Sequence, residues 1–183
     1  PGNPGHFMAA DYVRRIEIPA DIDRSHGDVH PQGNPHIHLH PRNIERVAEG
    51  SAHDDEFLGG ATDDTLRGGA GDDVLDGGDG NDVLYGGLGD DTLVGDLGVD
   101  EIHGSKGDDL LDGGHGADLL YGGAGEDHLI GGDTDDYLNG GRAADVIEGG
   151  SGADELWGRN GPDVLAGGEG VDDLRAGFGL DEC

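Results

Sequence analysis

The stretch GGAGDDVLD at residues 68–76, followed directly by GGDGNDVLY at 77–85 and GGLGDDTLV at 86–94, decides the fold. The three units agree in phase, with glycine at positions one and two, aspartate at position six and leucine at position eight. An internal period of this kind is typical of a solenoid, in which each repeat packs only on its neighbours. The sequence therefore predicts a repetitive architecture rather than a domain with one central core.

The same nine-residue period runs from Gly50 to the end of the chain. Fourteen complete units and a shortened fifteenth, AGFGLDEC, carry aspartate at position six without exception, from Asp55 to Asp181. Position eight is Phe57 in the first unit, leucine or isoleucine in every later complete unit and Cys183 in the last. A disordered, solvated acidic tail would not keep this register, so a disordered tail does not account for the repeats.

Composition divides the chain into two parts. Residues 50–183 hold 34 of the 41 acidic residues, five of the ten Lys and Arg and 36 of the 40 glycines, a net charge of −29. Residues 1–49 hold seven acids, five arginines and six histidines, so we expect a His-containing segment there and a repeat domain from 50 onward. The overall charge of −31 excludes nucleic-acid binding through phosphates, and no apolar run approaches the ~20 residues of a transmembrane helix.

Each unit contains the signals for one turn and one strand. Glycine at positions one, two and four permits a tight turn, and positions seven to nine, such as Val74 to Asp76, read as a three-residue strand whose middle side chain points inward. Two units then make one coil of a right-handed parallel β-roll, an all-β solenoid of about seven 18-residue coils preceded by a short irregular or helical segment. The resulting ladder of leucines is too thin to offset the backbone entropy of so many glycines.

The aspartate column supplies the missing stabilisation if it binds a cation. Aspartates 18 residues apart, such as Asp73 and Asp91, stack at about 4.8 Å and repel one another unless they are neutralised. Carboxylate and carbonyl oxygens are the ligands of Ca²⁺, whereas Mg²⁺ demands a stricter geometry. We expect the metal ligands to be the position-six aspartates Asp64, Asp73, Asp82, Asp91, Asp100, Asp109, Asp118, Asp127, Asp136, Asp145, Asp154, Asp163 and Asp172.

Some units depart from the pattern. Position four is not glycine in the units that begin at Gly50, Gly59, Gly131 and Gly140, so we expect weaker sites in those turns. The seven aspartates from Asp73 to Asp127 lie in the most regular units and should form the best sites.

The unit resembles G-G-x-G-x-D-x-U-x, the nonapeptide of the repeats-in-toxin (RTX) proteins, which form a calcium-binding parallel β-roll. The resemblance covers residues 50–183. It implies a secreted protein, exported by a type I machinery, that folds when it meets extracellular calcium and is fused to a domain outside this chain. It also implies that each ion lies between turn n and turn n+2, held by both position-six aspartates and nearby carbonyls. Seven neighbour pairs on one edge and six on the other then give at most 13 sites.

The segment before the repeats carries a different pattern. GNPHIHLHPRN at 33–43 resembles part of the zinc/manganese ABC-transporter substrate-binding proteins, and the resemblance over residues 1–48 places His36 on a metal-ligand position for Zn²⁺ or Mn²⁺. The alternative function is therefore a fragment of such an uptake receptor with a fused acidic tail. Apart from the resemblance, His36, His38 and His40 alternate, which on a strand puts them on one face, either as transition-metal ligands or as ordinary surface histidines.

The two ends of the solenoid need protection, because their strand edges are unpaired. Asn43 is a candidate N-cap for a short helix reaching Ala48, which could cover the first coil. The last unit stops at Cys183 and offers no cap, so we expect fraying and end-to-end self-association there.

The sequence contains no catalytic motif that we recognise, neither a nucleophile elbow nor a zinc-protease motif nor a phosphate-binding loop, and we do not expect an enzyme. Tyr85, Tyr121 and Trp157 recur at position nine, 36 residues apart, and should line one sheet face at every second coil. They are either a platform for stacking sugars or ordinary strand-filling aromatics.

Overall fold

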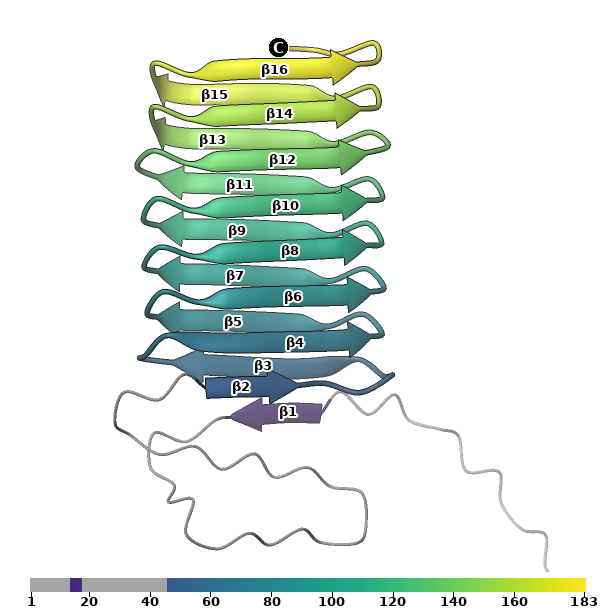
Figure 1. Ribbon diagram of the computed structural model, residues 1–183, viewed down its shortest axis with the longest axis vertical. Coiled ribbons are helices and arrows are strands. Elements are labelled where there is room, and N and C mark those ends of the chain that lie inside the picture. The colour runs from purple at the N-terminus through teal and green to yellow at the C-terminus, as the bar shows by residue number, and fades with distance from the viewer. Residues whose placement is uncertain (1–13, 18–45) are drawn as a thin grey trace, which may run out of the picture.

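The computed structural model describes residues 14–17 and 46–183. All regular secondary structure in this part of the chain is β-strand. The strands stack along the long axis, with successive strands pointing in opposite directions (Figure 1), and they form two facing sheets. One sheet holds the odd-numbered strands in sequence order, the other holds the even-numbered strands, and all paired neighbours are parallel. This arrangement confirms the predicted all-β parallel solenoid. Among the described residues, none forms a helix that could cross a membrane.

The two sheets share one layout. Sheet A consists of β1 (Arg14–Glu17), β3 (Asp55–Gly60), β5 (Val74–Asp79), β7 (Thr92–Leu97), β9 (Leu110–His115), β11 (His128–Asp133), β13 (Val146–Gly152) and β15 (Val164–Gly170). Sheet B consists of β2 (Arg46–Glu49), β4 (Asp64–Ala70), β6 (Val83–Leu88), β8 (Glu101–Lys106), β10 (Leu119–Ala124), β12 (Tyr137–Arg142), β14 (Glu155–Asn160) and β16 (Asp173–Phe178).

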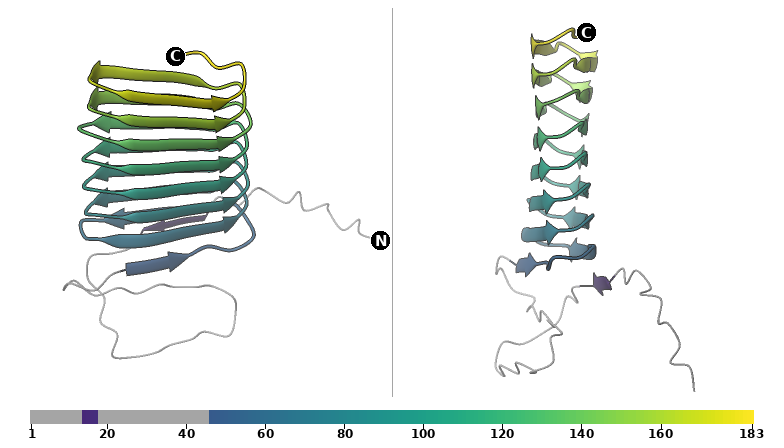
Figure 2. Two further views of the ribbon diagram at one scale, coloured as in Figure 1. Left: turned by 45° about the horizontal axis from the view of Figure 1, so that its top comes forward. Right: turned by 90° about the vertical axis from the view of Figure 1, so that its right-hand side faces the viewer.

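Within the repeats, neighbouring strands of a sheet are 18 residues apart and pair position by position. Leu75 of β5 pairs with Leu93 of β7, and Leu84 of β6 pairs with Ile102 of β8. Each coil therefore contains one strand of sheet A, one strand of sheet B and two turns. Viewed from the side, the sheets are two thin walls, and the turns form the two long edges of the molecule (Figure 2).

The core is a single ladder of position-eight side chains between the sheets. Twelve of them, from Phe57 to Leu156, have no exposed surface, and Leu165 is 3% exposed. Ala48 extends the ladder at the N-terminal end, and the partly buried Leu174 packs against it at the other. One large apolar residue in nine is a small core, as the sequence indicates.

The strands are longer than the three residues expected. Most have six residues, because the chain stays extended through positions one to three of the following unit, as in β6 from Val83 to Leu88. The glycines are required by close approach between coils: a Cβ atom on Gly87 would lie 2.2 Å from the carbonyl oxygen of Gly69. Gly87 also has a φ of 124°, which an L-residue rarely adopts.

The expected helix at 43–48 is wrong for residues 46–48. Arg46–Glu49 form strand β2, which pairs with β4 in sheet B, with Ala48 opposite Leu66. The physical reason is burial, because Ala48 falls in the phase of position eight and fills the next place in the core ladder. Strand β1 adds a further rung to sheet A, with Ile16 opposite Phe57. His36, with the rest of residues 18–45, lies outside the described residues.

Candidate calcium-binding turns

The position-six aspartates lie where each turn enters a strand, and they are buried. Ten of them, from Asp73 to Asp154, are at most 3% exposed, and Asp163 is 1% exposed. The repeat phase produces this burial because position six is two residues before the inward leucine and so points to the same side of the chain. Asp172 and Asp181, in the last two turns, are only partly buried. The thirteen predicted residues thus stand in two columns, one along each edge of the solenoid.

One carboxylate oxygen of each aspartate from Asp73 onward joins adjacent coils. Oδ1 of Asp91 accepts a hydrogen bond from the backbone N–H of Asp73 at 2.8 Å, and Oδ1 of Asp109 accepts one from the N–H of Asp91 at 2.8 Å. The same contact recurs along both columns as far as Asp163 and Asp181, at 3.2 Å. Position six therefore holds the coils together before any ion is considered.

The other carboxylate oxygen has no hydrogen-bond partner among the residues that the structure describes. Oδ2 is buried and accepts no hydrogen bond in eleven aspartates, which follow one another without a gap: Asp73, Asp82, Asp91, Asp100, Asp109, Asp118, Asp127, Asp136, Asp145, Asp154 and Asp163. An unsatisfied buried carboxylate oxygen costs far more than a neutral polar atom, and a native protein rarely leaves one unexplained. A bound cation would satisfy all eleven.

The space around Oδ2 is kept open by the glycine at position one. A Cβ atom on Gly122 would lie 2.4 Å from Oδ2 of Asp127 and 2.7 Å from the carbonyl oxygen of Gly140, in the next coil of the same edge. The equivalent atoms surround Gly113, between Asp118 and Gly131. The turns at Gly95, Gly113 and Gly122 thus direct a carboxylate oxygen and a carbonyl oxygen at one small volume. These hard oxygen ligands suit Ca²⁺.

The described residues contain no cluster of three or more His, Cys, Asp or Glu side chains arranged to hold a metal ion. The oxygens that meet at Gly113 and Gly122 are of a different kind, one from an aspartate side chain and one from a backbone carbonyl group. Glycine-rich turns expose carbonyl groups in this way, because no side chain covers them. The geometry therefore fits a cation that accepts many neutral oxygen ligands.

Burial makes these carboxylates hard to ionise without a cation. Loss of solvation raises the pKa of Asp82, Asp91 and Asp118 to about 7, although the hydrogen bond from the preceding coil lowers it. The pKa of Asp73 rises to about 6 for the same reason. Neighbouring aspartates of the column raise these pKa values further. A divalent cation at Oδ2 would reverse this effect, because it favours the charged form.

The irregular turns keep the geometry of the regular ones. Thr134 and Ala143 replace glycine at position four, and both adopt positive φ, at 76° and 77°. Asp136 and Asp145, which follow them, are buried with Oδ2 unpaired, as in the regular turns. The irregularity thus appears as backbone strain, on the order of 1–3 kcal/mol for each such residue, rather than as a lost turn.

The first turn differs. Oδ2 of Asp55 accepts hydrogen bonds from the backbone N–H of Ser51 at 2.7 Å and from its hydroxyl at 3.0 Å. In this turn the serine at position two therefore satisfies the Oδ2 atom, which in the other turns is left for an ion. This observation agrees with the expectation that the turn at Gly50 is a poor site.

The sequence did not reveal a second set of contacts, at position five. Oδ1 of Asp72 accepts the backbone N–H of Asp90 at 3.0 Å, and Oδ1 of Asp90 accepts that of Asp108 at 2.9 Å. These bonds point to the following coil, whereas those of position six point to the preceding one. The available signal was the recurrence of acids every 18 residues on one edge, at Asp54, Asp72, Asp90 and Asp108.

The aromatic stripe at position nine lies on the outer face of sheet B. His103 stacks between Tyr85 and Tyr121, with both pairs of ring centroids 4.8 Å apart and the rings within 8° of parallel. The flat faces of these rings are turned toward one another, so they are not free to stack on a sugar. The geometry favours the interpretation as strand-filling aromatics that pack across neighbouring strands.

Comparison with known families agrees with the geometry of the turns. The family model of the RTX calcium-binding nonapeptide repeat matches four times, at residues 58–93, 94–129, 130–165 and 148–182. No curated protein sequence matches the chain. Because these matches together span 58–182, well over half of the 183 residues, the chain belongs to the RTX calcium-binding nonapeptide repeat family.

Proposed function

We propose that this chain is an extracellular calcium-binding β-roll module that folds when it binds Ca²⁺ after secretion. The observation that carries the proposal is the row of eleven buried Oδ2 atoms without a hydrogen-bond partner. The family to which the chain belongs is a structural calcium-binding module, and a β-solenoid of such repeats fits this role. We assign the chain a binding and structural role rather than a catalytic one.

Electrostatics supports the coupling between calcium and folding. Residues 50–183 carry a net charge of −29, and folding brings their buried aspartates into columns with about 4.8 Å between coils. The core that opposes this repulsion is one side chain thick. Without a cation the extended chain is favoured, because it keeps its carboxylates solvated and its glycines unrestricted. Binding free energy then becomes folding free energy.

The calcium concentration outside a cell suits such a switch. Extracellular calcium modules bind at roughly 10⁻⁴–10⁻³ M, so cytosolic calcium would leave the chain unfolded and ready for export. Members of this repeat family are typically secreted, which supports an extracellular location and passage through a type I export machinery. A fused domain beyond this chain belongs to the same proposal.

Far-UV circular dichroism during a calcium titration tests the proposal directly. We expect a spectrum of an unfolded chain in EDTA and a β spectrum in millimolar Ca²⁺, with a cooperative transition between them. Mg²⁺ at the same concentration is the matched control and should produce little β-structure, because it fits a carbonyl-rich cage poorly. A β spectrum that persists in excess EDTA would contradict coupled folding.

The alternative function, a fragment of a zinc/manganese uptake receptor, gains no support from the family match, which begins at residue 58. Its single proposed ligand, His36, lies outside the described residues. The titration also separates the two functions, since tight Zn²⁺ or Mn²⁺ binding in the absence of Ca²⁺ would favour the receptor fragment.

A further inference from the structure

The outer faces of the two sheets carry opposite charge. The outward positions of β4 to β16 in sheet B hold every Lys and Arg of residues 50–183, namely Arg67, Lys106, Arg142, Arg159 and Arg175. They hold only three acids, Glu101, Glu155 and Asp173. The outward positions of β3 to β15 in sheet A hold no Lys or Arg and eight acids, namely Glu56, Asp76, Asp79, Asp96, Asp112, Asp133, Glu148 and Glu169. The chain as a whole is strongly acidic, so Lys and Arg side chains gathered on the repeat strands of one sheet and absent from those of the other are a distinct feature of these two faces.

The carboxylates on the outer face of sheet A repel one another. Loss of solvation raises the pKa of Asp76 and of Asp112. The charge of Asp96, on the strand between them, raises both pKa values further. Histidines approach only two of the eight acids, as in the pair of His115 Nδ1 with Asp133 Oδ2 at 2.7 Å. This face therefore attracts a cationic surface.

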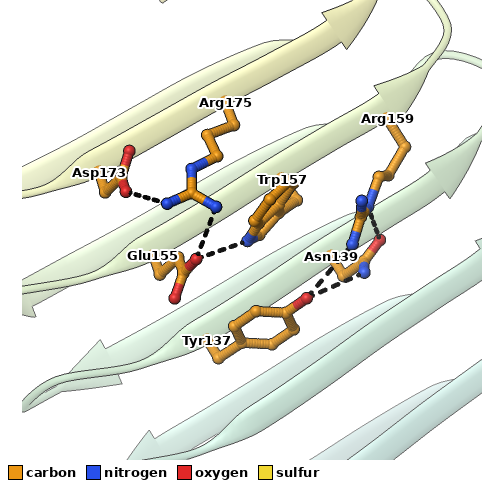
Figure 3. Close-up of polar contacts among 7 residues, drawn as sticks. All are labelled: Tyr137, Asn139, Glu155, Trp157, Arg159, Asp173 and Arg175. Carbon is orange, nitrogen blue, oxygen red and sulfur yellow. Dashed lines mark hydrogen bonds and ion pairs between the residues drawn. The ribbon is translucent and has the colours of Figure 1, made fainter.

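Sheet B presents such a surface, and its residues are held in place. The guanidinium groups of Arg159 and Arg175 both lie 4.1 Å from the ring centroid of Trp157 (Figure 3). Arg159 also donates to Oδ1 of Asn139 at 3.3 Å, and Arg175 pairs with Glu155 at 3.1 Å. Side chains fixed in this way lose little entropy when they meet a partner.

Two further cations of sheet B have no ion pair. Lys106 at the end of β8 and Arg142 at the end of β12 are exposed, and within the described residues neither side chain forms a salt bridge or hydrogen bond. Exposed apolar side chains accompany them, including Leu119, which is 39% exposed. On sheet A, Val74 and Val146 are 43% and 39% exposed. Both faces thus offer charged groups beside apolar surface.

We propose that sheet B docks against sheet A of a second copy of this chain, so that folded modules associate side by side. The two faces have the same 18-residue period and the same spacing of about 4.8 Å between strands, so one matched contact repeats along the whole length. Seven strands of about 20 Å span roughly 34 Å, which gives about 700 Å² on each partner and about 1,400 Å² in total, within the range of specific interfaces.

The association rests on the proposed function, because calcium controls the charge that opposes it. Eleven Ca²⁺ ions, one for each buried and unpaired Oδ2, would add 22 positive charges to the −29 of residues 50–183 and leave −7. Only then does the attraction between the faces exceed the repulsion between whole molecules. Since the two contacting faces differ, the contact is heterologous and leaves a free face at each end of the assembly, which grows with concentration.

Sedimentation velocity in millimolar Ca²⁺, over a series of protein concentrations, tests the association. The wild-type chain should show a weight-average mass that rises by about twofold or more with concentration and falls in high salt, which screens the contact. The double variant Lys106→Ala with Arg142→Ala should remain monomeric. Circular dichroism on the same samples reports folding independently. Failure to fold in calcium would contradict the proposed function, whereas a chain that folds but does not associate would contradict only the docking.

The matched control places the same change of charge on the edges instead of on a face. Ala144→Asp with Ala153→Asp makes the net charge more negative by the same two units, at position five of two turns, where other turns carry aspartate natively. This control should associate like the wild type. Equal association of both double variants, or a wild-type chain that folds in calcium but stays monomeric, would overturn the proposal. A folded monomer that binds polygalacturonate through Lys106 and Arg142 would overturn it in favour of an acidic polymer as partner.

Discussion

The carboxylate of Asp91 has two separate roles, because its Oδ1 accepts the backbone N–H of Asp73 at 2.8 Å while its Oδ2 is buried without a partner. The first oxygen fixes the side chain and its rotamer between adjacent coils. The second oxygen is thereby held in one place, next to Gly86. The repeat thus uses one aspartate both to join coils and to present an oriented ligand, which explains why no other residue type occurs at position six.

Removing the charge at Oδ2 should weaken calcium binding at that turn. In Asp91→Asn, the amide oxygen still accepts the N–H of Asp73, but an NH₂ group replaces the ligand oxygen. We expect the calcium midpoint of folding to rise by about tenfold. The midpoint is measured by circular dichroism during a calcium titration.

Two controls accompany this variant. Asp55→Asn should produce a clearly smaller shift, because Oδ2 of Asp55 is satisfied by Ser51. Asp79→Asn changes an exposed acid of β5 and should leave the midpoint unchanged. Equal midpoints for Asp91→Asn and Asp55→Asn would argue against ligation by the buried column.

A methyl group at position one should block the site without changing any charge. In Gly86→Ala the new Cβ would lie 2.3 Å from Oδ2 of Asp91, so the carboxylate must move away from its place. We expect a higher calcium midpoint and a lower thermal stability in saturating calcium. Leu88→Ala, at a 48% exposed position of the same strand, is the control and should change neither quantity appreciably. A Gly86→Ala chain with wild-type calcium affinity would refute the cradle at position one.

Acid should substitute in part for calcium. Burial raises the pKa of Asp82, Asp91 and Asp118 from 3.8 to about 7, so the calcium-free fold favours their protonated forms. Its stability is greatest below the unfolded pKa and is lost as pH rises through about 7. In EDTA, β-structure should therefore increase when the pH is lowered from about 8 to about 5. The triple variant with Asn at these three positions should show a smaller pH dependence, and a wild-type spectrum that stays unchanged would contradict the argument.

The sequence predicts the repeating parts of this molecule well, because each nine-residue unit keeps the same residue types at the same positions. The recurrence of Leu75 and Leu93 predicts the core ladder, and the gapless series from Asp55 predicts the buried column. Strands that continue through glycine pairs were not predictable from propensity, which disfavours glycine in strands. Those strands form because only glycine permits the approach of neighbouring coils.

The N-terminal rungs were not predictable from the sequence for another reason. Arg46–Glu49 match positions six to nine of the repeat only through Val47 and Ala48. Without aspartate and glycine, this match is too weak to outweigh the prediction of a helix. The segregation of charge, in contrast, could be predicted, because the 18-residue coil places residues 36 apart, such as Lys106 and Arg142, on the same sheet.

The last coil should be the least protected part of the solenoid. Leu84 and Leu93 have no exposed surface, whereas Leu174 is only partly buried and Phe178 is 82% exposed. Among the described strands of sheet B, β16 pairs with β14 alone. In saturating calcium we therefore expect hydrogen exchange to be faster around Leu174 than around Leu84.

The same exposure bears on the thiol. Cys183 is exposed, so the 183-residue chain should form disulfide dimers under oxidising conditions, and a reducing agent should abolish these without altering exchange at Leu84. Asp172 is only partly buried, unlike Asp91, so it should contribute little to calcium affinity, and Asp172→Asn should leave the midpoint near that of the wild type. Exchange around Leu174 as slow as that around Leu84 would show that one neighbouring strand and the bound ions suffice to hold a terminal rung, and the argument from its exposed side chains would then be wrong.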